Sequence, residues 1–293
     1  MHHNRHRVPH ILASLEGYVE WSHKVFLFGC YGNFDRVSEL RLPVSPTSER
    51  RKSLVVEGSD YGILCLSRFG EDPSALYLCN PATKQVKALP SLPIFSSNKK
   101  HQFGFGCDPL TNDFKRSKRM PRTLESYHSS ISDVKQHTSR LSCSLVLNGS
   151  VHWMLHFGSS RRWPRDLLTG IVAFDLNTEA VFRLIETPVK GIVHAMAKLS
   201  ECLSLIACDN MSNFINIWVM KEYGDSNYLI KQVAIDTTEH ELISSCPQPL
   251  CFASNGFMLL VGVDGFYLYV PNSNTVEDVF KSENERVGIH SSC

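Results

Sequence analysis

Two histidines, His152 and His156, come closest in this sequence to the spacing of a metal site. They lie four residues apart in a segment of strand-like alternation, so both would project from the same face of a strand. Zinc needs a third and usually a fourth ligand, and no Cys, Asp or Glu repeats on that parity. The sequence therefore favours a packed, hydrogen-bonded His152 over a zinc ligand and predicts no metal.

Gly104 and Gly106 form the only phrase that looks like a nucleotide-binding loop. The phrase lacks a third glycine and runs into Asp108-Pro109, which predicts a turn where a dinucleotide site needs a helix. No GxSxG, HExxH or P-loop pattern occurs. We therefore expect no cofactor, no catalytic residue and no enzymatic activity.

The 10 cysteines form no CxxC pair. Several lie inside apolar, strand-like runs, as Cys65, Cys79 and Cys208 do. This pattern predicts buried free thiols in a reducing compartment, and hence a location in the cytoplasm, the nucleus or both. The longest apolar stretch, residues 256–270, is interrupted by Asp264, so the sequence predicts no membrane span.

Charge gives no indication of a polyanionic partner. The 30 Lys and Arg residues balance 29 Asp and Glu residues, for a formal net charge of +1. Basic residues crowd only into residues 115–122, which suggests either a nucleic-acid or nuclear-import patch or a solvated, degraded edge of a sheet. The neutral balance favours the second interpretation, so we expect no nucleic-acid partner and no membrane partner.

Short strands bounded by turns must position these residues. Residues 144–157 alternate between apolar and polar side chains around Asn148-Gly149, which is a strong hairpin signal. Similar strands are expected over residues 171–174, 203–208, 215–220 and 266–270. No window predicts a long amphipathic helix.

A turn of the type Asn/Asp-x-x-Thr/Ser recurs along the chain. It begins at Asn80 and Asp175 and, more weakly, at Val270, which gives two intervals of 95 residues. Half of that interval is about 47 residues, within the range of β-propeller blades, and turn-like residues also stand near positions 33, 128 and 222. The sequence therefore predicts an all-β, β-propeller-like (kelch-like) array of about six degenerate four-stranded blades, with a β-sandwich as the alternative.

Six phrases, in order over residues 54–224, resemble the F-box-associated interaction domain of plant F-box proteins. Residues 56–66 (VEGSDYGILCL) are similar to the family's GSCNGLLCL, residues 103–115 (FGFGCDPLTNDFK) to YGFGYDPSTNDYKV, and residues 147–153 (LNGSVHW) to VNGALHW. Residues 78–90, 171–179 and 217–224 match further family phrases. The resemblance implies structural roles for the motif residues Gly58, Gly62, Asn80, Pro81, Gly104, Gly106, Asp108, Pro109, Gly149, His152, Trp153, Asp175, Trp218 and Tyr223.

Two departures from the family pattern affect the expected domains. No F-box pattern is found, so residues 1–20 are interpreted as a remnant that follows a missing F-box, and residues 21–284 as the propeller-like domain. After Lys115 the family pattern is lost, which predicts a degenerate or disordered segment over residues 115–142. Residues 285–293 are expected to form a C-terminal tail.

Aromatic and arginine residues in polar loops indicate a binding face, because such side chains often dominate protein interfaces. We expect Arg161, Arg162 and Trp163 in the 158–169 loop, and Tyr223 and Tyr228 in the 223–228 loop, to contact a partner.

The resemblance implies the target-recruiting part of an SCF-type ubiquitin ligase subunit. Its partner would be a target protein, and a Skp-type adaptor and cullin would join only if an F-box were supplied upstream. The alternatives are a β-propeller hydrolase with axial carboxylates or a metal, and a truncated product without function.

Overall fold

The computed structural model describes fifteen stretches of the chain. These are residues 10–17, 23–29, 37–40, 54–68, 76–90, 104–117, 142–157, 168–187, 189, 192–209, 214–238, 248–252, 255–262, 265–281 and 285–288. The statements below concern these residues.

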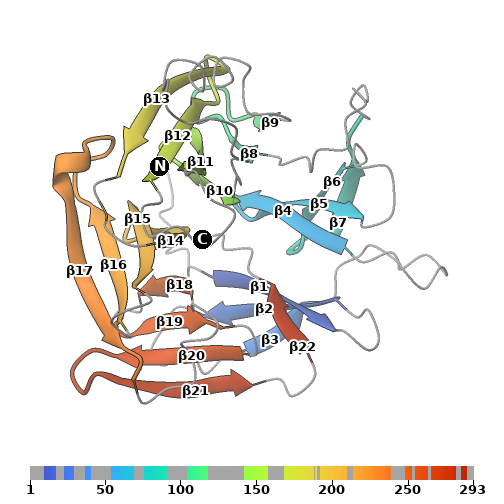
Figure 1. The fold of residues 1–293 in the computed structure, drawn as a ribbon. Coiled ribbons are helices and arrows are strands. Elements are labelled where there is room, and N and C mark those ends of the chain that lie inside the picture. Colours follow the sequence, from blue (N-terminus) through green and yellow to red (C-terminus); the bar gives the residue numbers. More distant parts are fainter. Residues whose placement is uncertain are drawn as a thin grey trace, which may run out of the picture.

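The described residues form six antiparallel sheets arranged as a ring (Figure 1). Five sheets have four strands each, in the spatial orders β22 (Glu285–Gly288), β1 (His10–Gly17), β2 (His23–Gly29), β3 (Val37–Leu40); β4 (Leu54–Asp60), β5 (Ile63–Arg68), β6 (Leu76–Asn80), β7 (Gln85–Ala88); β10 (Ser142–Leu147), β11 (Ser150–Phe157), β12 (Leu168–Asp175), β13 (Ala180–Glu186); β14 (Ile192–Leu199), β15 (Cys202–Asp209), β16 (Phe214–Met220), β17 (Leu229–Asp236); and β18 (Gln248–Phe252), β19 (Met258–Val261), β20 (Gly265–Val270), β21 (Thr275–Lys281). The remaining sheet pairs β8 (Gly104–Cys107) with β9 (Phe114–Ser117), and a single 3-10 turn, η1 (Ser226–Tyr228), precedes β17.

This arrangement confirms the propeller-like prediction over the sandwich. The first strands of successive sheets, β4, β8, β10, β14 and β18, contact one another in turn and face the middle of the ring in Figure 1. A sandwich would instead stack two sheets face to face.

Ring closure corrects the expected domain bounds. The C-terminal strand β22 pairs with the N-terminal strand β1, with Ser14 opposite Gly288 and Gly17 opposite Glu285. The boundaries drawn after residues 20 and 284 exclude both strands, although the two complete one four-stranded sheet. No local signal indicates this pairing, because the two strands lie at opposite ends of the chain.

Local turn chemistry explains the hairpins. At Asn148-Gly149 both residues have positive φ, 51° and 68°, and the turn joins β10 to β11 with Leu147 opposite Ser150. Two consecutive left-handed residues match the twist of a tight hairpin, which is why Asn-Gly suits this position. The turns predicted at residues 80, 175, 222 and 270 each join the third and fourth strands of a sheet. Those near residues 33 and 128 lie outside the described residues.

A one-residue bulge recurs in the first strand of four sheets. The register shifts between residues 56 and 58, 142 and 144, 193 and 195, and 249 and 251. A bulge increases local twist and bends a strand. Its repetition in the first strand of four of the six sheets is a structural repeat that residue types alone do not reveal.

The core lies between neighbouring sheets. One cluster joins β14–β17 to β18–β21 through residues such as Ile217, Ile235 and Leu260. A second joins β10–β13 to β14–β17 through Met154, Ile171 and Leu205. Because these sheets bury apolar faces against their neighbours, they depend on one another for stability.

Candidate protein-binding face

One end of the ring carries short turns that join the first to the second strand, or the third to the fourth strand, of a sheet. We call this end the turn face. Its described residues are 61–62, 81–84, 109–113, 148–149, 176–179, 200–201, 221–228, 255–257 and 271–274. Hydrogen bonds between turns of neighbouring sheets, described below, hold several of these turns together.

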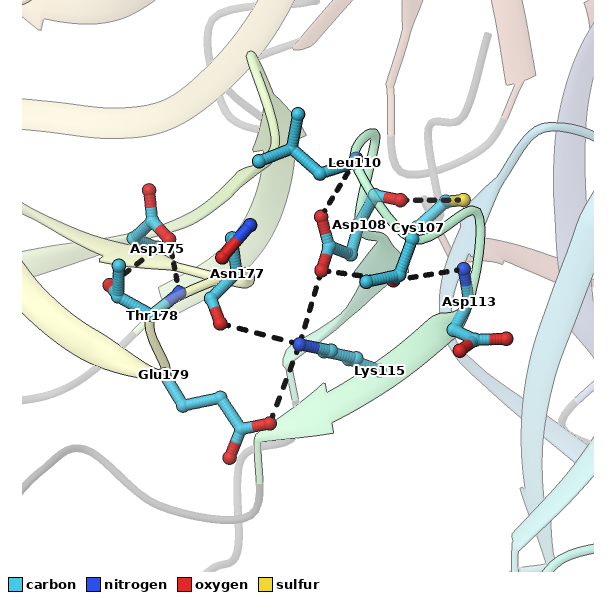
Figure 2. A network of polar contacts seen from close by, with 10 residues as sticks. Cys107, Asp108, Leu110, Asp113, Lys115, Asp175, Asn177, Thr178 and Glu179 are labelled. Atoms are coloured by element: carbon cyan, nitrogen blue, oxygen red, sulfur yellow. Dashed lines mark hydrogen bonds and ion pairs between the residues drawn. The ribbon is translucent and has the colours of Figure 1, made fainter.

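Asp108 organises the turn between β8 and β9 (Figure 2). Its fully buried carboxylate accepts hydrogen bonds from the Leu110 backbone N–H and the Thr111 hydroxyl, both at 3.0 Å. Lys115 Nζ lies 3.1 Å from the same carboxylate. The Leu110 N–H above all, helped by Lys115 and Thr111, lowers the pKa of Asp108. The carboxylate therefore stays ionised and fixes the turn as a loop between two strands.

Lys115 fastens this hairpin to the neighbouring sheet. Beyond Asp108, its ammonium donates to the Asn177 carbonyl oxygen at 3.4 Å and lies 3.5 Å from Glu179 Oε1 (Figure 2). These acceptors belong to the turn between β12 and β13. The interpretation of Lys115 as part of a degraded edge is therefore wrong at its first residue, since β9 runs to Ser117. Residues 118–141 lie outside the described residues.

Asp60 links the β8–β9 hairpin to its other neighbour, the sheet of β4–β7. Its Oδ2 accepts the Cys107 backbone N–H at 2.8 Å, which joins the end of β4 to the end of β8. Burial raises the pKa of Asp60 despite the hydrogen bonds to Cys107 and Tyr61 and the nearby Lys198. Burial and the three carboxylates around Cys107 raise the pKa of its thiol.

His152 is a packed histidine, as predicted. Its fully buried ring places Nδ1 3.2 Å from the Leu145 carbonyl oxygen and Nε2 2.7 Å from the Tyr223 hydroxyl. A carbonyl only accepts, so Nδ1 carries the proton and Nε2 accepts from Tyr223. Burial lowers the pKa of His152 to about 4, which keeps the imidazole neutral near pH 7.

Tyr223 is consequently not the exposed binding residue that the sequence predicted. Its ring packs edge-on against His152 with centroids 5.6 Å apart, and it is partly buried against the core. Tyr228, in contrast, is 43% exposed.

The glycines of the FGFG phrase permit close packing. A Cβ at Gly104 would lie 2.6 Å from Trp153 Cζ2, and one at Gly106 would lie 2.8 Å from Val146 Cγ2. At Gly149 a Cβ would meet Pro109 at 2.8 Å, so two family phrases touch there. These contacts explain the glycines without a nucleotide.

The other motif residues are structural as well. Asn80 Oδ1 accepts the N–H groups of Ala82 and Thr83 across Pro81, and Asp175 Oδ1 accepts that of Thr178 at 2.7 Å. A Cβ at Gly58 would lie 3.3 Å from Phe105 Cβ, and Gly62 turns the chain with a φ of 76°. Trp153 is 1% exposed and packs against Phe174, and Trp218 is partly buried against the core.

The loops predicted to bind together do not begin at the same end of their sheets. Ser150 pairs with Asp175 at the turn face, whereas Phe157 pairs with Leu168 at the far end of β11 and β12. The strand ends Phe157 and Leu168, which flank residues 158–167, therefore lie at the end of this sheet opposite the turn face, and the predicted contacts of both loops with a partner stay a prediction. Arg161, Arg162 and Trp163 themselves lie outside the described residues.

The sequence did not predict two exposed apolar side chains of the turn face. Tyr61 is 64% exposed and Leu110 is 77% exposed, and both lie on turns linked by the Asp60–Cys107 hydrogen bond. Their signal was an apolar residue inside a turn-forming phrase, Asp60-Tyr61-Gly62 and Asp108-Pro109-Leu110. Both phrases were interpreted only as family motifs.

Titratable side chains occur on the first strands of two sheets, where a propeller hydrolase would carry its axial carboxylates. Glu57 and Asp60 lie on β4, and His194 and Lys198 lie on β14. The Ser67 hydroxyl donates to Glu57 at 2.5 Å. Within the described stretches, no three His, Cys, Asp or Glu side chains gather as a metal site would need.

The cysteines follow the prediction in part. Cys65, Cys79 and Cys107 are buried free thiols, and Cys202 is free and partly buried. Cys208 is disulfide-bonded, which corrects the expectation for this residue. Among the described residues, no helix is both long and apolar enough to span a membrane.

Comparison with known families agrees with this architecture. The model of the F-box associated beta propeller domain matches residues 37–253, and the chain belongs to this family. It is 28% identical over 224 residues to the F-box protein At3g07870 of Arabidopsis thaliana, a match covering 62% of this chain and 51% of that protein. The chain thus matches about half the length of this curated relative.

Two solved structures resemble the chain at low identity. TolB from Acinetobacter baumannii superposes with a TM-score of 0.50 at 14% identity, over 96% of this chain and 66% of that one. KlAtg21, in its complex with the coiled coil of AgAtg16, gives a TM-score of 0.49 at 11% identity, over 97% and 89% of the two chains. The similarity to TolB supports the propeller-like fold and carries no information on function.

Proposed function

We propose that this chain is the target-binding part of an F-box protein and that it acts without chemistry of its own. The observation that carries the proposal is family membership over residues 37–253, together with similarity to a curated F-box protein. In such a ligase subunit, a bound target is held close to the ubiquitin-conjugating machinery, which raises the effective concentration of its lysines.

The turn face supports a binding role over a catalytic one. Its buried polar groups are used internally, since Asp108 is satisfied by Leu110, Thr111 and Lys115, and His152 by Leu145 and Tyr223. What remains toward solvent is a set of short, rigid turns with exposed side chains. Rigid loops on a fixed scaffold are well suited to recognise a partner.

The proposal assigns adaptor binding to an F-box and not to the ring. A Skp-type adaptor and a cullin would join only through an F-box upstream of residue 1, and the protein would then work in the cytoplasm, the nucleus or both.

Affinity capture tests this function. The chain alone and the chain fused behind the F-box of At3g07870 would each be used to capture partners from plant extract, read by quantitative mass spectrometry. We expect both to enrich the same target, and only the fusion to bring down a Skp-type adaptor. Stoichiometric adaptor on the chain alone, or the absence of a shared target, would contradict the proposal.

A further inference from the structure

Tyr61 and Leu110 are exposed apolar side chains on two turns of the turn face that are joined by the Asp60–Cys107 hydrogen bond. They are 64% and 77% exposed, more than any other large hydrophobic side chain in the described part of the chain. Exposed tyrosine in particular is enriched among residues that dominate protein interfaces.

Both side chains are held on rigid turns. Tyr61 and Gly62 adopt positive φ values of 48° and 76°, and Asp60 anchors the start of that turn on Cys107 N–H at 2.8 Å. Leu110 is fixed through its own N–H to Asp108, and the Asp108 N–H donates to the Asp113 carbonyl oxygen at 2.9 Å. A pre-ordered turn loses little entropy when it binds, so its exposed side chains are effective anchors.

The turn face as a whole carries more acidic than basic side chains. Within two residues of the described turns stand eight acidic side chains and four lysines, an excess of four negative charges on a chain whose total is +1. The acidic residues are Asp60, Asp108, Asp113, Asp175, Glu179, Glu201, Glu222 and Asp225, and the lysines are Lys84, Lys115, Lys198 and Lys221. Lys115 pairs with Asp108, and Lys198 with Glu201 at 2.9 Å; each ion pair removes one positive and one negative charge, so the excess of four remains.

We infer that the turn face docks a Lys/Arg-rich segment of a partner protein that inserts an apolar side chain between Tyr61 and Leu110. The negative excess attracts a basic segment and repels nucleic acids and anionic membranes. This inference rests on the proposed function and names the chemistry of the target segment.

Synthetic peptides test the inference directly. Two pools of short peptides would carry a central Leu or Phe flanked either by Lys and Arg or by Asp and Glu, within a Ser/Gly background. Binding to the full chain would be followed by fluorescence anisotropy at low and at physiological salt. We expect the basic pool to bind at least about tenfold more tightly, with affinity falling as salt rises.

Matched variants locate the site. Tyr61→Ala and Leu110→Ala should each weaken the basic peptides about tenfold, as expected for interface anchors. Phe214→Ala removes an exposed apolar side chain (39%) from the start of β16, where Phe214 pairs with Asp236 at the end of the sheet opposite the turn face, and should leave affinity unchanged. Circular dichroism melts confirm that all three variants fold.

Three results would overturn the inference: equal binding of both pools, no binding of the basic pool, or equal effects of the anchor and control variants. The two proposals remain separable. A target captured equally well by wild type and the Tyr61→Ala/Leu110→Ala double variant refutes this surface and leaves the function standing. Intact peptide binding without a captured target refutes the function alone.

Discussion

Replacing Tyr223 by Phe removes one hydroxyl from the contact between two neighbouring sheets. The hydroxyl lies 2.7 Å from Nε2 of the fully buried His152. Because Nδ1 donates to the Leu145 carbonyl, Nε2 is an acceptor that loses its donor in the variant. The edge-on ring contact is preserved, since phenylalanine keeps the ring.

The magnitude follows from the burial of His152. A buried acceptor left without a donor costs about 1–3 kcal/mol, whereas an exposed hydrogen bond costs little. We therefore expect Tyr223→Phe to lower the free energy of unfolding by about 1–3 kcal/mol. Tyr228→Phe is the matched control, because Tyr228 lies on the same loop and is 43% exposed, and it should change stability by less than about 0.5 kcal/mol.

Urea unfolding followed by tryptophan fluorescence measures both values, with Trp153 and Trp218 in the adjoining sheets as reporters. The slope of the transition should stay unchanged, so that the shift in midpoint reports stability. If Tyr223→Phe unfolds at the same midpoint as Tyr228→Phe, the hydrogen bond across the sheets does not stabilise the ring and the assigned tautomer is wrong.

Three further predictions follow from the same contacts. The His152 imidazole should titrate by NMR with a pKa of about 4, and a titration near 6.5 would refute the buried contact. Because this pKa lies below the ordinary value of 6.5, the contribution of His152 to stability is complete above pH 6.5 and is lost as the pH falls toward 4. Asp108→Asn should lower the thermal midpoint more than Glu179→Gln, since Lys115 lies 3.1 Å from the buried Asp108 but 3.5 Å from Glu179, whose side chain is 69% exposed; equal shifts would remove Asp108 from the centre of the network. Gly104→Ala should cost about 1–3 kcal/mol, because its Cβ would lie 2.6 Å from Trp153, and Gly58→Ala should cost less at 3.3 Å from Phe105; urea unfolding that reverses this order would contradict the packing described.

The strands were predictable because their signals are local. Alternation around Asn148-Gly149 identified β10 and β11, and the turns at Asn80 and Asp175 identified the repeat. The pairing of β1 with β22 was not predictable, because it depends on the chain closing on itself.

The candidate site was only partly predictable for a related reason. Asp108 and His152 were recognised as motif residues and Asp60 was not, and the partners of all three, Cys107, Lys115 and Tyr223, come from other elements or other sheets. Spacing along one chain carries no information on such contacts. Tyr223 illustrates the error that results, since an aromatic residue in a polar loop turned out to face a buried histidine.

Ubiquitin transfer in a reconstituted system tests the central claim most directly. The chain fused behind the F-box of At3g07870 would be combined with a Skp-type adaptor, a cullin, the ubiquitin enzymes and the captured target, and the modified target quantified over time. The account predicts modification with the fusion and none with the unfused chain. Equal modification without the chain, or a fusion that binds adaptor and target but never supports transfer, would contradict it.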